Sequence, residues 1–368
     1  MAELRDASGL PPTIYDVARI AGVSIASVSR VLNDRRNPRP ETRERVLMAV
    51  SELGFAPDGA ARALSARLKE VVGVVMRRVR WGGDEPGGFA EEDENLQFTD
   101  VLNRGIEIAA QRRGFNLLIG SVYVDDHDVH GRLLALAGKT DGLILHDHVL
   151  EPAQLEHLSR RVPIVTLANV ATATTVNVHG DNRSGMRDLA RHLLREHGYR
   201  TLAYLSGLTD SPDSVARLET VAAEAAAAGA ELLTGPQWQG NYYAAGGAQV
   251  IERLIGSGAA LPRAIVCAND QTALGVMHAL GRRGLDVPGD VAVAGYDDVP
   301  MARHLRPQLT TVRQPIRDIG ATAFDVLHAM IGHAVPAERD IALPTRLVVR
   351  ESCGCAAGGP PVTAARAG

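Results

Sequence analysis

From residue 71 onward, short apolar runs alternate with stretches of helical periodicity. The apolar runs are VVGVVM, FNLLIG, DGLILH and PIVTLA in the first half of this region, and TLAYLSG, AIVCAND and VAVAGYDD in the second. The pattern predicts helices between them, at 99–113, 185–196, 215–228 and 272–282. Strands that alternate with helices are typical of parallel sheets covered by helices on both faces. This region is therefore predicted to be an α/β domain built from doubly wound parallel sheets.

Polar residues follow several of these predicted strands. They are Asn169, Asn269 with Asp270, and Asp297 with Asp298. In doubly wound sheets, ligands bind at the carboxyl ends of the strands, so these side chains are candidate ligand contacts. Each one has a structural alternative, because an Asp or Asn at such a position also caps the following helix.

The first sixty residues show a different, all-helical pattern. Thr13 and Asp16 resemble a capping box that opens a helix, and Gly22 ends it. Ser24 is placed to cap a second helix, and a third amphipathic helix follows Pro40. Two short helices joined by a glycine turn and backed by a third form the helix-turn-helix arrangement.

The second of these helices carries small, apolar and bidentate groups on its outer face. These residues are Ile25, Ala26, Ser29, Arg30 and Asn33. Arginine can donate two hydrogen bonds to guanine, and small apolar groups can contact thymine methyls. Residues 24–45 also contain six arginines and three acidic residues, although the whole chain has a net charge of −4. A locally positive surface favours DNA, and the alternative is a three-helix bundle whose exposed arginine has no role.

Two stretches make the comparison with a known family specific. TIYDVARIAGVSIASVSRVLN and PETRERVLMAVSELGFAPDGAARALS resemble the N-terminal signature of the lactose-repressor (LacI/GalR) family. The resemblance is dense over about the first 70 residues and continues as scattered motifs to about residue 354. It implies that Ile25, Ala26 and Arg30 read bases. It further implies that Ser24, Ser29 and Asn33 also contact DNA, and that Tyr15 and Thr42 contact phosphates.

The segment PDGAARALSAR lies between the helical region and the first strand. An isolated helix of this length is marginal in water, so the segment is predicted to fold upon binding DNA. The family resemblance implies paired hinge helices in the minor groove, with Leu64 as an apolar wedge between base pairs. The alternative is that Leu64 belongs to the core of the following domain.

The α/β region also contains family motifs. VNVHGDNRSG and GYDDVPMARHLRPQLTTVRQP are similar to the family's pattern, and they imply the two-lobed fold of periplasmic sugar-binding proteins, with an effector between the lobes. A long loop at 77–94 precedes the first predicted contacts. The effector contacts implied by the resemblance are Asn95, Phe98, Asn169, Asp181, Arg217, Tyr242, Asn269, Asp297 and Gln314, the last at a crossover between lobes.

The sequence thus predicts an allosteric transcriptional repressor. It is expected to bind a pseudo-palindromic operator as a homodimer or higher homo-oligomer. Its expected effector is a small molecule, a sugar. The predicted domains are a DNA-binding domain at 1–57, a hinge at 58–70, an effector domain at 71–355 and a disordered tail at 356–368. The alternative is a solute-binding protein without DNA regulation. Motifs such as the P-loop, GxGxxG and GxSxG are missing, so an enzyme is not expected.

The chain has three cysteines, Cys267, Cys353 and Cys355, a sparse and odd set that argues against a disulfide framework. Cys353 and Cys355 are spaced too tightly for the usual zinc pair, and no second pair is near them in the sequence. The triplet at 146–148, HDH, could bind a metal, but such loop histidines are more often surface residues. No metal or cofactor is therefore expected. The chain shows no signal peptide and no membrane-length apolar run, which predicts a cytoplasmic protein.

Overall fold

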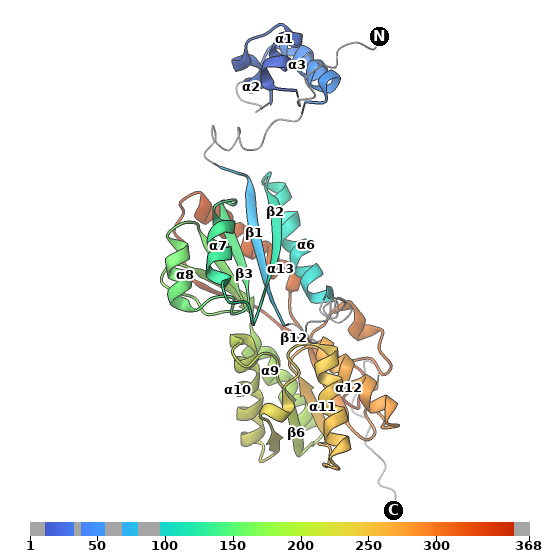
Figure 1. The fold of residues 1–368 in the computed structure, drawn as a ribbon. Coiled ribbons are helices and arrows are strands. Elements are labelled where there is room, and N and C mark those ends of the chain that lie inside the picture. The colour runs from blue at the N-terminus through green and yellow to red at the C-terminus, as the bar shows by residue number, and fades with distance from the viewer. Residues whose placement is uncertain (1–11, 33–37, 56–67, 80–95, 357–368) are drawn as a thin grey trace, which may run out of the picture. The chain divides into compact units, whose positions relative to one another are not determined.

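The computed structural model describes residues 12–32, 38–55, 68–79 and 96–356. The chain divides into two compact units, residues 1–69 and residues 70–368, which Figure 1 draws as ribbons. Three predicted contact residues, Asn33, Leu64 and Asn95, lie outside the described residues. So do most of the predicted hinge, most of the long loop and all but residue 356 of the predicted tail.

Three helices form the N-terminal unit: α1 (Ile14–Ala21), α2 (Ile25–Leu32) and α3 (Pro40–Leu53). The expected caps are present: Thr13 and Asp16 form a capping box, and Gly22 ends α1 in the left-handed conformation. The Ser24 hydroxyl accepts a hydrogen bond from the Ser27 backbone N–H at 3.2 Å and so caps α2. The apolar faces of the three helices meet in one core around Val17, Val28 and Val46, each fully buried.

Lobe 1 of the second unit comprises residues 71–180 and 316–343. Its sheet has the order β11-β5-β4-β3-β1-β2, and all its strands are parallel. The strands are β1 (Val71–Arg78), β2 (Asn116–Tyr123), β3 (Gly142–His146), β4 (Ile164–Leu167), β5 (Val176–Gly180) and β11 (Asp340–Leu343). The helices are α6 (Leu96–Arg112), α7 (Val129–Ala137), α8 (Pro152–Ser159) and α13 (Ile316–Ile331).

Lobe 2 comprises residues 182–313 and 346–355. Its sheet has the order β12-β10-β9-β8-β6-β7, parallel except that β12 runs antiparallel to β10. The strands are β6 (Thr201–Leu205), β7 (Glu231–Leu233), β8 (Ala264–Cys267), β9 (Ala292–Asp297), β10 (Thr310–Arg313) and β12 (Arg346–Val348). The α-helices are α9 (Asn182–Arg191), α10 (Pro212–Ala227), α11 (Ala244–Gly256) and α12 (Asp270–Arg282). The shorter helices are the π-helical turn η2 (His192–Glu196) and the 3-10 turns η3 (Pro236–Trp238) and η4 (Pro300–Arg303).

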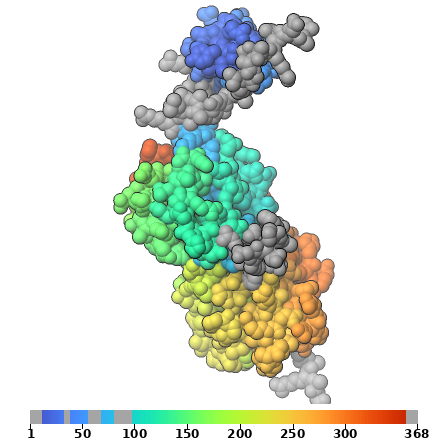
Figure 2. Space-filling model, in the orientation of Figure 1, coloured from blue at the N-terminus to red at the C-terminus, as the bar shows by residue number. Residues whose placement is uncertain are grey.

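Both sheets are covered on both faces, which explains why their central strands read as continuous apolar runs. In lobe 1, α6 and α13 pack on the face that includes Ile144, while α7 and α8 pack on the face that includes Leu143 and Leu145. In lobe 2, α9 and α10 cover one face and α11 and α12 the other. Figure 2 shows the two lobes as blue-green and yellow-to-orange masses that meet along one boundary. The predicted doubly wound α/β fold is confirmed.

Three chain crossings connect the lobes, and they lie against one another. They fall at Asp181, at Gln314 with Pro315, and at Thr345. The Thr345 hydroxyl donates to the Asp181 carbonyl at 2.8 Å. A Cβ at Gly180 would lie 2.8 Å from Gln314 Oε1 and 3.2 Å from the Thr345 methyl, so any larger residue would require the Gln314 side chain to shift. Relative motion of the lobes must therefore bend all three crossings together.

Among the described helices, none is both long enough and apolar enough to cross a membrane.

Candidate functional site

A cavity that is partly open to solvent lies where the carboxyl ends of the strands in both lobes meet. Lobe 1 contributes Arg77 from β1, His146 from β3 and Phe98 from α6. Lobe 2 contributes Arg217 from α10 and Asp297 from β9. We refer to this cavity as the cleft.

Arg217 is the fixed cation of the cleft, and only 4% of its surface is exposed. Its Nε donates to Asn182 Oδ1 at 2.7 Å, and its terminal nitrogens donate to the Ala268 carbonyl at 2.7 Å and to Asp213 Oδ2 at 3.1 Å. The guanidinium carbon lies 3.7 Å from the centre of the Tyr296 ring. A guanidinium has five N–H donors and does not lose its charge, so donors remain for a ligand after these three bonds.

Asp297 ends β9 with a positive φ of 121° and is almost completely buried. Gln314 donates to its Oδ1 at 2.6 Å. Burial raises the pKa of Asp297 to about 7, although Arg217 and the hydrogen bond from Gln314 act to lower it. Asp270 is also buried, and burial together with the charge of Asp297 raises the pKa of Asp270. This end of the cleft therefore exchanges a proton close to neutral pH.

Asp147 provides an acceptor that the described protein leaves unsatisfied. It lies directly after β3 with φ 61°, it is buried, and it lines the cleft. Among the described residues, its Oδ1 has no hydrogen-bond partner. A buried acceptor without a donor costs about 1–3 kcal/mol. A ligand hydroxyl that donates to Oδ1 would remove this cost.

Tyr242 supplies the aromatic face. The backbone at Tyr242 has φ 72°, and its hydroxyl lies 3.0 Å from Ser211 Oγ. The ring packs directly on Gly207, where any Cβ would collide with it. Glycine at this position therefore allows the aromatic ring to lie in the cleft.

Several contacts join the lobes beside the cleft. Arg77 of lobe 1 forms a bidentate ion pair with Asp210 of lobe 2, at 2.9 and 2.6 Å. The Val79 N–H donates to the Tyr243 hydroxyl at 3.3 Å. These contacts connect the two lobes directly.

The predicted effector contacts fall into two groups. Phe98, Arg217, Tyr242, Asn269, Asp297 and Gln314 line the cleft. Asn169 and Asp181 are not among the residues that line it. Asn169 donates from Nδ2 to the Asp147 carbonyl at 3.0 Å, and Asp181 caps α9 by accepting from the Ser184 N–H at 3.0 Å.

Sequence reasoning missed several residues of the cleft, among them Arg77, His146, Asp147 and Asp213. The HDH triplet was noticed only as a possible metal site. His146 is half-buried in the cleft, and desolvation lowers its pKa to about 4, so its imidazole is neutral at neutral pH. The triplet belongs to none of the metal-competent clusters of three or more groups in the described part of the chain.

The fold gives the two C-terminal cysteines neighbours that the sequence does not reveal. Cys353 and Cys355 have no second ligand pair near them in the sequence, but the fold brings His192 and His197 beside them. The reason is topological: α9 and its π-helical turn pack next to the C-terminal turn that follows β12.

The predicted DNA-reading face of α2 is exposed. Ser24, Ile25, Ala26 and Arg30 are exposed, and Ser29 is half-buried. Ile25 is 41% exposed although it is a large apolar residue. Arg30 Nε donates to the Ala26 carbonyl at 3.1 Å, so its side chain lies back along the helix. Elsewhere in the unit Tyr15 is 68% exposed and Thr42 is half-buried.

Both units of the chain match models of known protein families. Residues 13–58 match the model described as bacterial regulatory proteins, lacI family, and residues 190–353 match a periplasmic binding protein-like domain. Catabolite control protein A of Priestia megaterium is 30% identical over 344 residues, which cover 92% of this chain and 98% of that protein.

Solved structures give the same result. The lac repressor dimer bound to operator and the anti-inducer ONPF matches with a TM-score of 0.77 at 27% identity, covering 94% of this chain and 99% of that one. The complex of the transcriptional regulator CelR with cellobiose matches with a TM-score of 0.64 at 29% identity, covering 93% and 99%.

A helix-turn-helix unit joined to a two-lobed domain with a cleft at its strand ends defines a ligand-responsive, DNA-binding transcriptional regulator. The chain belongs to the LacI family of bacterial regulatory proteins.

Proposed function

We propose that this protein is a cytoplasmic, homodimeric repressor without catalytic activity, and that a small hydroxyl-rich molecule, a sugar or sugar derivative, controls its binding to a pseudo-palindromic operator. One observation carries the choice of effector. The cleft combines the fixed donors of Arg217, the unpaired acceptor Asp147 Oδ1 and the aromatic ring of Tyr242.

The chemistry of a hydroxyl group matches this combination. A hydroxyl both donates and accepts, so neighbouring hydroxyls can accept from Arg217 and donate to Asp147 or Asp297 at the same time. The ring of Tyr242 offers an apolar face to the C–H surface of a sugar ring. The complex of the related CelR with cellobiose supports a saccharide. A purine is the competing ligand, because the same ring could stack on it.

The DNA-binding role rests on the exposed face of α2. We assign base contacts to Ile25, Ala26 and Arg30, and phosphate contacts to Tyr15 and Thr42. A dimer with two-fold symmetry requires an operator whose half-sites share that symmetry. The related lac repressor, which was solved as a dimer bound to operator, supports this assembly. Ligand and operator affinities are then coupled, each changing the other by the same factor.

The test begins with a thermal-shift screen of sugars and nucleosides against the full-length protein. Hits are measured by isothermal titration calorimetry, and operator binding by fluorescence polarisation with a palindromic duplex. The decisive variant is Asp147→Asn, which keeps the side chain's shape and tolerates the positive φ. We expect it to weaken the ligand at least about tenfold, since the negative charge is lost and one of the two acceptor oxygens becomes an amide donor, while operator affinity without ligand is unchanged.

The matched control is Asp325→Asn, an exposed carboxylate on α13 outside the cleft, which should behave as wild type. Wild-type ligand affinity in Asp147→Asn would refute the assigned cleft. A screen in which nucleosides bind and sugars do not would refute the saccharide assignment alone. If selection from a random pool of duplexes enriched no palindromic sequence, the regulatory role would be refuted.

A further inference from the structure

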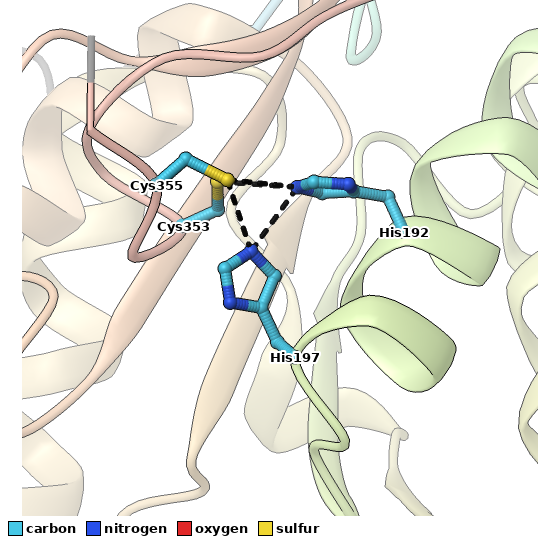
Figure 3. A group of neighbouring side chains, drawn as sticks. All are labelled: His192, His197, Cys353 and Cys355. Carbon is cyan, nitrogen blue, oxygen red and sulfur yellow. Dashed lines mark hydrogen bonds between the residues drawn. The ribbon is translucent and has the colours of Figure 1, made fainter. Parts of the chain in front are cut away.

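Four metal-binding side chains meet in lobe 2, on the side of the sheet where the strands begin and away from the cleft. His192 and His197 come from the end of α9 and its π-helical turn, and Cys353 and Cys355 come from the C-terminal turn (Figure 3). Their ligand atoms all lie within 4.8 Å of one another. Three of the four residues are buried and His197 is half-buried.

We propose that His192, His197, Cys353 and Cys355 bind one zinc ion in a closed, structural site that fastens the C-terminal turn to lobe 2. This site is independent of the proposed effector and operator. Two sulfur and two imidazole ligands in a compact group favour Zn²⁺ over Mg²⁺ or Ca²⁺, which prefer oxygen.

The distances fit a tetrahedron around a single ion. His192 Nε2 and His197 Nε2 are 3.2 Å apart, and Cys355 Sγ lies 3.7 Å and 3.4 Å from these two nitrogens. Cys353 Sγ lies 3.4 Å from His192 Nε2. With zinc–sulfur bonds of about 2.3 Å and zinc–nitrogen bonds of about 2.0–2.1 Å, the edges of a regular tetrahedron are about 3.3–3.8 Å long. These four separations, 3.2–3.7 Å, are close to the edge lengths, and the two remaining pairs, which both involve Cys353, lie within 4.8 Å.

Hydrogen bonds within the cluster satisfy its four groups poorly. A neutral imidazole donates from one nitrogen only, and a thiol is a weak donor and a weak acceptor. Both histidines nevertheless turn Nε2 toward the same point as the two sulfurs, as Figure 3 shows. A cation at that point accepts a lone pair from all four at once. All three cysteines of the chain are free thiols in the structure.

The surroundings of the cluster resemble the outer shell of a metal site. His192 Nδ1 lies 3.0 Å from Glu196 Oε2, a carboxylate that fixes which nitrogen faces the cluster. The Thr310 hydroxyl donates to Cys353 Sγ at 3.1 Å, and the Tyr199 hydroxyl donates to the Cys353 carbonyl at 2.7 Å. With four protein ligands the site is complete, as in structural rather than catalytic zinc sites.

Two local features of the backbone create this arrangement. In an α-helix, residues five apart point about 140° away from each other, so His192 and His197 would not share a face. The π-helical turn removes this separation, and the His197 N–H donates to the His192 carbonyl at 3.3 Å. Gly354 has φ 102°, a conformation that lets Cys353 and Cys355 both turn toward the histidines.

The experiment uses the full-length protein, purified without a polyhistidine tag and without chelators. Inductively coupled plasma mass spectrometry should find one zinc per chain that survives dialysis. Cys355→Ser and His197→Gln should each lose it. The matched controls are Cys267→Ala, a buried cysteine of β8, and His278→Gln, an exposed histidine of α12; both should keep the zinc.

Cobalt substitution tests the same site without any variant. Wild-type protein refilled with Co²⁺ should show the strong visible bands of tetrahedral cobalt and a thiolate-to-cobalt charge-transfer band. Removing zinc with a strong chelator should lower the melting temperature of the wild type but not that of Cys355→Ser.

Three results would overturn the proposal. The first is wild-type protein that neither retains zinc nor takes up cobalt. The second is a cobalt spectrum without thiolate bands. The third is mass-spectrometric detection of a disulfide between Cys353 and Cys355 in fresh protein.

Discussion

Individual polar side chains in the cleft differ in whether the protein already uses their hydrogen-bonding atoms. Asn269 lines the cleft, but its Oδ1 accepts from the Thr272 N–H and its Nδ2 donates to the Tyr242 carbonyl. It therefore shapes the cleft more than it offers contacts. Asp147 and Arg217 are the opposite case, since each retains hydrogen-bonding capacity beyond its described partners.

The raised pKa of Asp297 predicts a pH dependence of stability. Burial raises the folded-state pKa to about 7, above the ordinary value of 3.8, so the folded protein holds this proton more tightly than the unfolded chain. The resulting stability is present in full below about pH 3.8 and is lost as the pH rises through about 7. We expect the melting temperature of the ligand-free protein to fall as the pH rises from about 4 to about 7.

Asp297→Asn is the variant that isolates this effect. It should show a smaller fall in melting temperature over the same pH range, because the amide does not titrate. The neighbouring residues Arg217, Asp213, Asp298 and Asp270 are the same in both proteins. Parallel melting curves for the two proteins across this range would contradict the assignment of the shift to Asp297.

At the scale of helices and strands, the proposed DNA recognition rests on α2. Arg30→Ala should reduce specific operator affinity by about 1–3 kcal/mol and relax the preference at one base position, because a bidentate base contact is lost. Selection from a random duplex pool, followed by fluorescence polarisation, measures both effects.

The matched control is Arg45→Ala, an exposed arginine of α3 outside the reading face. It should change affinity equally for all sequences, if at all, and leave the selected consensus intact. An unchanged consensus for Arg30→Ala would remove Arg30 from base reading.

The elements that sequence reasoning predicted are those with strong local signals. The Thr13 capping box, Gly22 and Ser24 define α1 and α2 from a few adjacent residues. The predicted strands of the α/β region are apolar runs that form strands of four to eight residues, and all of them except β2 are largely buried. Strands such as β7 and β12, with three residues each, carry no pattern that separates them from loops. The parallel sheets could be predicted, whereas their edge strands depend on partners distant in the sequence.

The cluster of His192, His197, Cys353 and Cys355 could not be predicted from the sequence for the same reason. A pair of histidines five residues apart predicts nothing on an α-helix, and the π-helical turn that changes their geometry leaves no sequence pattern. The contact between residues 192–197 and 353–355 depends on tertiary packing. Similarly, Arg77, His146 and Asp213 enter the cleft because strand ends from two lobes converge, which spacing along the chain does not reveal.

At the scale of the whole effector unit, the ion pair between Arg77 and Asp210 favours closure. Asp210 is not among the residues that line the cleft, so Asp210→Asn removes the charge without removing a cleft contact. A partly exposed, bidentate pair contributes up to about 1 kcal/mol. We expect ligand affinity to fall by up to about fivefold, because the closed form loses this stabilisation.

Calorimetry gives the affinity, and small-angle scattering of the ligand-free protein should show a more open form. Glu219→Gln is the matched control, because Glu219 pairs with Arg183 inside lobe 2 alone. If the two variants bind ligand equally well, the pair between the lobes has no part in closure.

The three crossings make lobe 1 discontinuous in the chain, which matters while the protein is being synthesised. The strands around Ile144, Val165 and Val176 emerge from the ribosome first, but Phe324 and Leu327 of α13, which share their core, emerge only after residue 313. Domains that are continuous in sequence fold as they emerge. Lobe 1 instead must wait for all of residues 182–313, while α6 alone covers the apolar face that it later shares with α13. We therefore expect nascent chains of this protein to bind chaperones until α13 has left the exit tunnel.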